Sequence, residues 1–199
     1  MKRINNKGLT TIEILVTFVI TATIVISMYA SITNLKNKET IASYKESIIT
    51  YRDLLTKEIQ DDLITKHLIS VIPDETNKRV TFFFKNGESK ILSVDQQTSN
   101  HNLGSGNVTL CKKSNQTTSA RDAIIYDNTT YELPNLGSEY VNINGTGCTN
   151  VYSLRIKSMN IETVTVEDAA YVLSVKIELW HPDLGNKYSI NIVSPIDYK

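Results

Sequence analysis

The sequence is poor in several residue types that would mark a specialised class of protein. It contains two cysteines, which are too few for a disulfide-rich scaffold. Lysine and arginine together number 21, as do aspartate and glutamate, so the formal net charge is zero. A balanced charge provides neither the basic field of a nucleic-acid-binding protein nor the acidic excess of a disordered tail. The composition therefore carries no direct nucleic-acid signal.

Motifs for catalysis are also absent from the sequence. There is no HExxH, Walker, GxSxG or CxxC pattern, and the three histidines, His67, His101 and His181, are widely separated. Asp61 and Asp62 form an adjacent carboxylate pair, which we interpret as part of a solvated helix face. The sequence therefore predicts no catalytic residue, no bound metal, no cofactor and no enzymatic activity.

Charge is missing from one long stretch near the N-terminus. No residue from Ile14 to Leu35 is charged, a run of about 22 residues, and a helix of about 20 apolar residues crosses a bilayer. Neither glycine nor proline occurs between Leu9 and Ile72. We therefore expect a membrane-spanning helix over residues 9–35. The basic residues that precede it favour an N-terminus inside the cell and a head outside.

Three kinds of N-terminal segment contain an apolar run. A secretory signal peptide has a shorter run, of about 7–15 residues, with small residues before its cleavage site. Here the run is longer, and Met28 in SMYAS occupies a position where a small residue is required. An ordinary membrane anchor and a prepilin signal remain. They differ in that a prepilin is cut before the apolar run.

Glu13 distinguishes these two alternatives. A carboxylate deep in lipid costs about 2.5–3.5 kcal/mol, and a plain anchor has no use for it. Cleavage after Gly8 would leave the amino group of Leu9 as a positive charge, one helical turn from Glu13. In a bundle of identical helices, the Leu9 amine of one chain could pair with Glu13 of a neighbouring chain. Because losing one partner of a buried pair costs about 3–5 kcal/mol, the pair would set the register between helices.

These residues resemble the N-terminal signature of type IV pilins and type II secretion pseudopilins. The match lies in KGLTTIEILVTFVITATIVI: a basic leader, Gly8, an apolar Leu9, Glu13 as the fifth residue after the cut, and then the apolar helix. It covers about 25 residues, roughly an eighth of the chain. Many of these proteins carry a helix-breaking proline or glycine in the apolar helix, and this chain does not.

The resemblance implies a structural subunit of a type IV pilus or of a type II secretion or competence pseudopilus. It implies that residues 1–8 are a leader, removed between Gly8 and Leu9 by a prepilin peptidase that also N-methylates Leu9. The implied location is the bacterial cytoplasmic membrane, with a single span, and then a cell-surface filament. The implied partners are the lipid bilayer before assembly, other pilin or pseudopilin subunits, the peptidase/N-methyltransferase and the membrane platform of the assembly machine. The large head and the unbroken helix favour a minor pilin or pseudopilin.

Two other functions are compatible with the sequence. The chain could be a single-pass membrane-anchored extracellular binding or sensory domain that does not polymerise. Its N-terminus would then stay intact, and Glu13 would be dispensable. The chain could also be a surface-anchored hydrolase, which would require a histidine and a carboxylate to cluster in the head.

Helical periodicity continues after the apolar segment. Apolar side chains recur at steps of three and four residues and form one stripe along the helix. They are Ile41, Tyr44, Ile48, Tyr51, Leu55, Ile59 and Leu63. Charged residues occupy the other faces. The pattern therefore predicts an amphipathic continuation of the helix over residues 36–72, with Pro73 as its latest possible end.

Alternating sequences after residue 72 predict antiparallel strands. RVTFFFK and SKILSV flank Asn86-Gly87, which is typical of a tight hairpin turn. YVLSVKIELW and KYSINIVS predict a second hairpin, and VYSLRIK and IETVTVE are further strand candidates. About five to seven strands beside one long helix make an α+β fold with a β-rich head over residues 73–199. The resemblance implies that this fold is pilin-like.

The two cysteines lie between these hairpins. Cys111 lies within a stretch rich in Asn, Ser and Thr, and Cys148 lies in NGTGCTN. The pair could form a disulfide if this part of the chain is outside the cell, or could remain two buried thiols. A metal site with His101 is a third alternative. A Cys111–Cys148 bridge would resemble the disulfide-bounded variable loop of many pilins.

Overall fold

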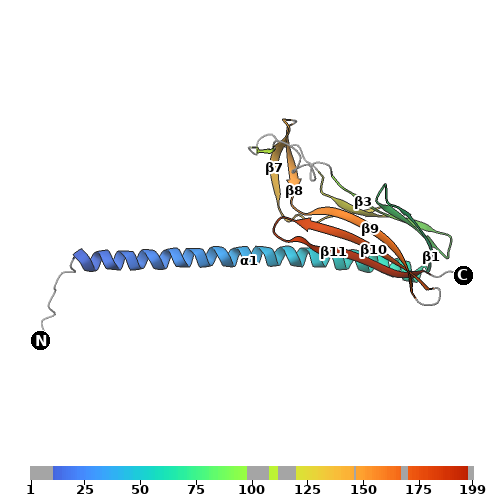
Figure 1. Cartoon of the computed structure of the whole chain (residues 1–199), viewed down its shortest axis with the longest axis horizontal. Coiled ribbons are helices and arrows are strands. Elements are labelled where there is room, and N and C mark those ends of the chain that lie inside the picture. Colours follow the sequence, from blue (N-terminus) through green and yellow to red (C-terminus); the bar gives the residue numbers. More distant parts are fainter. Residues whose placement is uncertain (1–10, 98–107, 112–119, 146, 167–169, 197–199) are drawn as a thin grey trace. The chain divides into compact units, whose positions relative to one another are not determined.

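The computed structural model describes the chain except for residues 1–10, 98–107, 112–119, 146, 167–169 and 197–199 (Figure 1). It divides the chain into two compact units, Met1–Ser43 and Tyr44–Lys199. One helix and antiparallel β-sheets make up the described residues, so the expected α+β class is confirmed. The described part of the first unit is helical, and the second unit holds the rest of that helix and the strands.

The helix α1 runs from Thr11 to Thr65. The absence of glycine and proline from this range allows it to continue without a break. It ends where His67 adopts a φ of 56°, a left-handed conformation that commonly closes the C-terminal end of a helix. The predicted limit at residue 72 is therefore wrong, because the chain leaves the helix before Leu68 and enters a strand.

Five strands form the first sheet, in the order β1-β2-β3-β5-β6. They are β1 (Leu68–Asp74), β2 (Arg79–Phe84), β3 (Ser89–Asp95), β5 (Ala123–Tyr126) and β6 (Thr129–Glu132). The predicted hairpin of β2 and β3 is confirmed, and Gly87 in its turn has a φ of 84°, which glycine adopts without strain. The sequence pattern does not predict β1, which contains Pro73. Proline is tolerated there because β1 is an edge strand.

Three long strands form the second sheet, in the order β11-β10-β9. They are β9 (Arg155–Val166), β10 (Ala170–His181) and β11 (Gly185–Ile196). The predicted hairpin of β10 and β11 is confirmed, and alternate residues of β10 are buried on one face, as the pattern predicts. These residues are Leu173, Val175, Ile177 and Leu179.

A small third sheet has the order β4-β7-β8. Its strands are β4 (Val108–Leu110), β7 (Ser138–Ile143) and β8 (Cys148–Tyr152). The residues that the structure describes thus form eleven strands, more than the five to seven expected. Several of the additional strands, such as β4, β5 and β6, have only three or four residues, in which alternation is too brief to be recognised.

The part of α1 in the second unit packs against the two larger sheets (Figure 1). Four residues of its apolar stripe expose 1% of their surface or less: Ile48, Leu55, Ile59 and Leu63. Burial of each such side chain contributes about 1.5–3 kcal/mol. Tyr51 Oη donates to the carbonyl of Tyr131 in β6 at 2.7 Å, and Gln60 Nε2 donates to the carbonyl of Val193 in β11 at 3.4 Å. The stripe therefore packs on sheet, as the sequence predicts.

Candidate functional site

The described part of the first unit is an apolar helix whose large side chains are exposed in the isolated chain. The exposed large hydrophobic residues between Ile12 and Leu35 show 48% to 75% of their surface. A contiguous apolar surface of this kind is unfavourable in water and marks a contact with lipid or protein. The helix is long and apolar enough to cross a membrane. The expected transmembrane-like helix is thus confirmed by length and composition, and it is compatible with a single-pass anchor.

The serine and threonine hydroxyls of this segment are satisfied within the helix. Every serine and threonine between Ile14 and Leu35 donates its hydroxyl to the carbonyl four residues earlier, at 2.7 to 2.9 Å. These residues are Thr17, Thr21, Thr23, Ser27, Ser31 and Thr33. A hydroxyl bonded in this way leaves no unsatisfied donor in an apolar environment. Sequence patterns do not reveal these bonds, because each depends on the side-chain rotamer that the helix selects.

Glu13 lies in the first turn of α1, and its carbonyl accepts the hydrogen bond from Thr17 Oγ1 at 2.7 Å. A carboxylate at this end of a helix interacts favourably with the helix dipole, by about 0.3–1 kcal/mol. The helix end thus favours the charge of Glu13. Gly8 and Leu9 lie outside the described residues. Leader cleavage, methylation of Leu9 and its pairing with Glu13 therefore stay predictions.

Cys111 and Cys148 form a disulfide, with their Cα atoms 6.0 Å apart. The bridge joins the end of β4 to the first residue of β8. It consumes both thiols, so the alternatives of two free thiols and of a metal site with these cysteines do not apply. His101, the third member of that alternative, lies outside the described residues. In the described ranges, no group of three or more His, Cys, Asp or Glu side chains could hold a metal ion.

Asp62 lies where α1 meets the first sheet, in a group of side chains that we call the Asp62 cluster: Asp62, Lys66, Lys90 and Tyr126. Asp62 Oδ2 accepts hydrogen bonds from Tyr126 Oη of β5 at 2.8 Å and from Lys90 Nζ of β3. Lys66 Nζ lies 3.6 Å from Asp62 Oδ1. The Asp62 side chain is only 22% exposed. The interpretation as a solvated face is therefore wrong for Asp62, whereas Asp61 is exposed.

Asp62 and Tyr126, the two acidic groups of the Asp62 cluster that share a hydrogen bond, differ in protonation state. Burial acts to raise the pKa of Asp62, but the hydrogen bonds from Lys90 and Tyr126 and the nearby positive charges lower it below its usual value. Burial and the Asp62 carboxylate together raise the pKa of Tyr126. Asp62 is therefore ionised and Tyr126 protonated at neutral pH. The hydrogen bond between helix and sheet persists under those conditions.

Two buried polar residues bind backbone groups of distant segments. Asp122 has no exposed surface, and its carboxylate accepts hydrogen bonds from the backbone N–H groups of Gln97 at 2.9 Å and Ile156 at 2.8 Å. It thereby ties the first sheet to the start of β9. His181, at the end of β10, has Nε2 3.2 Å from the carbonyl of Leu136 and accepts a bond at Nδ1 from the backbone of Asp183. Both ring nitrogens of His181 therefore contact backbone groups of the fold.

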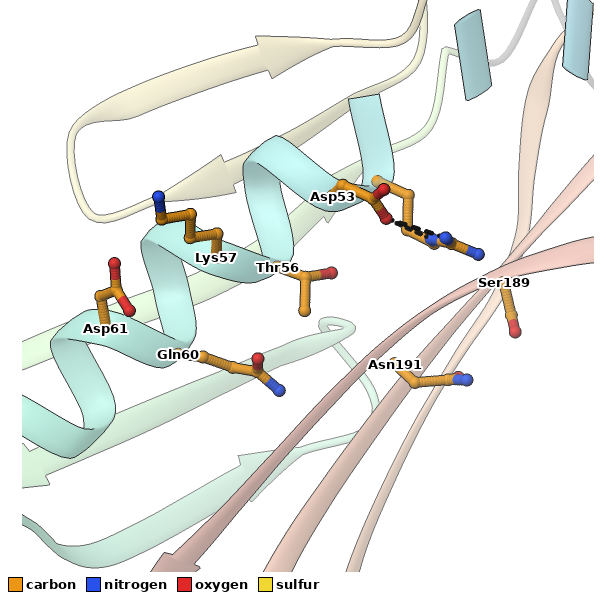
Figure 2. A pocket seen from close by; sticks show the side chains of 8 residues that line it. Asp53, Thr56, Lys57, Gln60, Asp61, Ser189 and Asn191 are labelled. Carbon is orange, nitrogen blue, oxygen red and sulfur yellow. Dashed lines mark hydrogen bonds and ion pairs between the residues drawn. The ribbon is translucent and has the colours of Figure 1, made fainter. Parts of the chain in front are cut away.

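A cleft of about 420 Å³ opens between α1 and β11, and we call it the polar cleft (Figure 2). Every described residue that lines it is polar or charged. They are Arg52, Asp53, Thr56, Lys57, Gln60, Asp61, Ser189 and Asn191. Arg52 Nη2 forms an ion pair with Asp53 Oδ1 at 2.8 Å, and the buried hydroxyl of Thr56 has no hydrogen-bond partner. Sequence analysis does not find the cleft, because helix and strand lie far apart in the chain.

The fold and these sites define a class of protein: a chain with a transmembrane-like helix and an α+β domain. No protein-family model, curated protein or solved structure matches it. The resemblance to pilins and pseudopilins therefore rests on the residues of the N-terminal segment alone.

Proposed function

We propose that the chain is a pilin-like structural subunit, of the minor pilin or pseudopilin kind. In this proposal it leaves the membrane and joins a filament through its N-terminal helix. The observation that carries the proposal is an uncharged apolar helical segment that begins directly after a single carboxylate, Glu13. Lipid can cover such a helix, and so can the equivalent helices of neighbouring subunits. A plain lipid anchor accounts for the apolar residues but not for the carboxylate.

In this proposal, Glu13 determines the position of each helix along its neighbour in the filament. A prepilin peptidase cuts between Gly8 and Leu9 and methylates the new amine of Leu9. Before assembly, Glu13 lies near the helix end, where it can reach the membrane interface. Within a filament, the surroundings are apolar, and the Leu9 amine of a neighbouring subunit neutralises the carboxylate. A helix displaced along the bundle would bury both charges unpaired, so one register is strongly favoured.

The hydroxyl bonds within the helix support the same transfer from lipid to filament. Serine and threonine hydroxyls are bonded to carbonyls of their own helix, so these residues present no unsatisfied hydroxyl donor to either environment. Exchanging lipid contacts for helix contacts therefore requires no change in these bonds. Glu13 is then the group whose energy depends most on the position of the neighbouring helix.

Within the second unit, the last part of α1 packs firmly on the sheets. A subunit that is carried into a filament by this helix requires such packing. The buried stripe of α1 and the Asp62 cluster join the helix to the first sheet, and Gln60 contacts β11 of the second. These contacts involve residues 44–65 and leave the earlier, apolar part of the helix available for lipid or for other subunits.

The N-terminal peptide tests the proposed processing. The chain is expressed in a bacterial membrane that contains an active prepilin peptidase, and mass spectrometry identifies the first residue. We expect a peptide that starts at N-methylated Leu9. A chain that starts at Met1 or Lys2, while a control prepilin is cleaved in the same cells, would contradict the proposal. It would favour the single-pass anchored domain that does not polymerise.

Substitution of Glu13 tests the assembly step separately from processing. Glu13→Gln keeps the size of the side chain and removes its charge, so a filament would bury an unpaired amine at a cost of about 3–5 kcal/mol. We expect incorporation into sheared filaments, measured by quantitative immunoblot, to fall roughly a hundredfold or more. Glu13→Ala should behave in the same way, and the shorter Glu13→Asp should be intermediate.

Leader cleavage and membrane insertion should be unchanged in all three variants. Glu39→Gln is a matched control, because it makes the same chemical change at an exposed position of the same helix, beyond the apolar run. Its incorporation should equal that of the unmodified chain. Equal incorporation of Glu13→Gln and Glu39→Gln would refute the pairing with Leu9.

A further inference from the structure

The polar cleft lies along the free edge of β11. This strand pairs with β10 on one side and, among the described residues, pairs with no strand on the other. β1 contacts β11 without joining its sheet. An edge strand carries a row of backbone N–H and C=O groups that point away from its sheet. These groups can bond to another extended chain.

Two observations establish which residues of β11 direct their backbone groups outward. The carbonyl of Val193 accepts a hydrogen bond from Gln60 of α1, so it points away from β10. Pro195 has no N–H, and proline in a sheet lies where the missing group would face outward. The pairing of β11 with β10 is regular over this range, and outward groups recur every second residue. The backbone N–H and C=O groups of Ser189 and Asn191 therefore also point away from β10.

Ser189 and Asn191 are also the two residues of β11 that line the polar cleft. Figure 2 shows Thr56 and Gln60 of α1 on the opposite wall, directed towards the strand. Gln60 satisfies the outward carbonyl of Val193 and so closes one end of the cleft. At Ser189 and Asn191 the helix and strand are separated by the open volume of about 420 Å³, which lies in the range of ligand sites.

We propose that the polar cleft binds an extended polypeptide segment, which adds as a strand to the free edge of β11. The main chain of the bound segment exchanges hydrogen bonds with the outward groups of Ser189 and Asn191, as in other cases of strand addition beside a helix. Thr56, whose buried hydroxyl has no partner, provides one further hydrogen-bonding group from the helix wall.

The lining of the cleft specifies the side chains of this segment. Among the described residues, no apolar one lines the cleft, so an apolar segment would gain little by burial there. Two cations, Arg52 and Lys57, are balanced by two carboxylates, Asp53 and Asp61, so a segment of high net charge gains little attraction. The segment that fits is polar and largely uncharged. This inference is independent of the proposed filament, because all residues of the cleft belong to the unit Tyr44–Lys199.

The test uses the full-length protein in lipid nanodiscs and a random library of twelve-residue peptides. Enriched peptides are synthesised, and their dissociation constants are measured by fluorescence anisotropy. Asn191→Pro removes the backbone N–H that points away from β10. β11 tolerates proline at such a position, because Pro195 has the same orientation. Asn191→Ala is its matched control, because it removes the side chain and keeps the N–H. Asp61→Trp fills the cleft from an exposed position of the helix.

We expect polar peptides to be enriched. Asn191→Pro should weaken their binding about tenfold, Asn191→Ala should weaken it much less, and Asp61→Trp should abolish it. Failure to enrich any peptide above empty nanodiscs would overturn the proposal, as would equal effects of Asn191→Pro and Asn191→Ala. If Asn191→Pro does not fold, undiminished binding to Asp61→Trp overturns the proposal and lost binding supports it. Binding of maltohexaose that Asn191→Ala and Asn191→Pro both remove, with no peptide enriched, would overturn the proposal and assign the cleft to a carbohydrate instead.

Discussion

Replacing Tyr126 by phenylalanine should weaken the attachment of α1 to the first sheet. The change deletes the hydroxyl that donates to Asp62 Oδ2 at 2.8 Å and keeps the buried ring. A hydrogen bond to a charged group contributes about 1.5–3 kcal/mol. Because the Asp62 side chain is 22% exposed and Lys66 and Lys90 still contact it, the lower part of this range applies. We expect the free energy of unfolding to fall by about 1.5–2 kcal/mol.

This loss should depend on pH. Burial opposes the ionisation of Asp62, but the bonds from Lys90 and Tyr126 outweigh it and lower the pKa of Asp62 in the folded chain. A carboxylate with a lowered folded-state pKa contributes stability that is fully present above its unfolded-state pKa of about 3.9. That contribution is lost as the pH falls through the folded-state pKa. The difference between the unmodified chain and Tyr126→Phe should therefore be largest at neutral pH and shrink below about pH 4.

Unfolding by urea in detergent micelles measures both effects. Trp180 is the single tryptophan and lies in β10, so its fluorescence reports on the second unit. Tyr131→Phe is the matched control, because the Tyr131 hydroxyl bonds to Glu58 at an exposed position, where water screens the interaction. It should reduce stability less than Tyr126→Phe does. An unchanged stability of Tyr126→Phe at neutral pH, or a loss that is the same at pH 3 and pH 7, would refute the account of the Asp62 cluster.

Two further predictions concern links within the second unit. The double variant Cys111→Ser and Cys148→Ser releases a crosslink between residues 37 apart, which should lower the free energy of unfolding by about 3–4 kcal/mol. A reductant should bring the unmodified chain to the same stability and leave the variant unchanged; an equal effect on both would show that the bridge is not responsible. Asp122→Ala leaves the backbone N–H groups of Gln97, which is half-buried, and of Ile156, which is buried, without their acceptor and should cost about 2–4 kcal/mol in the same assay. Asp61→Ala, at an exposed position, should change stability little, and a similar loss in both variants would contradict the role of Asp122.

Elements with a strong local pattern could be predicted from the sequence. The hairpins of β2 with β3 and of β10 with β11 combine clear alternation with a recognisable turn, and the stripe of α1 recurs at helical spacing. The end of α1 could not be predicted, because residues 66–72 carry no glycine or proline that would stop a helix. The pairing of β1 with β2 competes with the helix there, and the left-handed conformation of His67 turns the chain into the strand.

The same division holds for the residues of the candidate sites. Glu13 and the uncharged run after it are evident in the sequence, because a membrane helix and a charge within it are defined by neighbours along one helix. The role of Asp62 is not evident. Asp61 and Asp62 are the same residue type at adjacent positions, and only folding brings Tyr126, 64 residues away, to one of them.

The sequence by itself determined the apolar segment, the position of its one carboxylate and the strands of strong alternation, because each depends on residues a few positions apart. Tertiary structure decided which carboxylates are buried, which edge of β11 pairs with no other described strand and where the polar cleft opens. These properties depend on segments that are distant in the chain, such as Gln60 and Val193, and on the backbone groups between them. Such groups are the same in every residue except proline, so no sequence pattern reports whether they are paired.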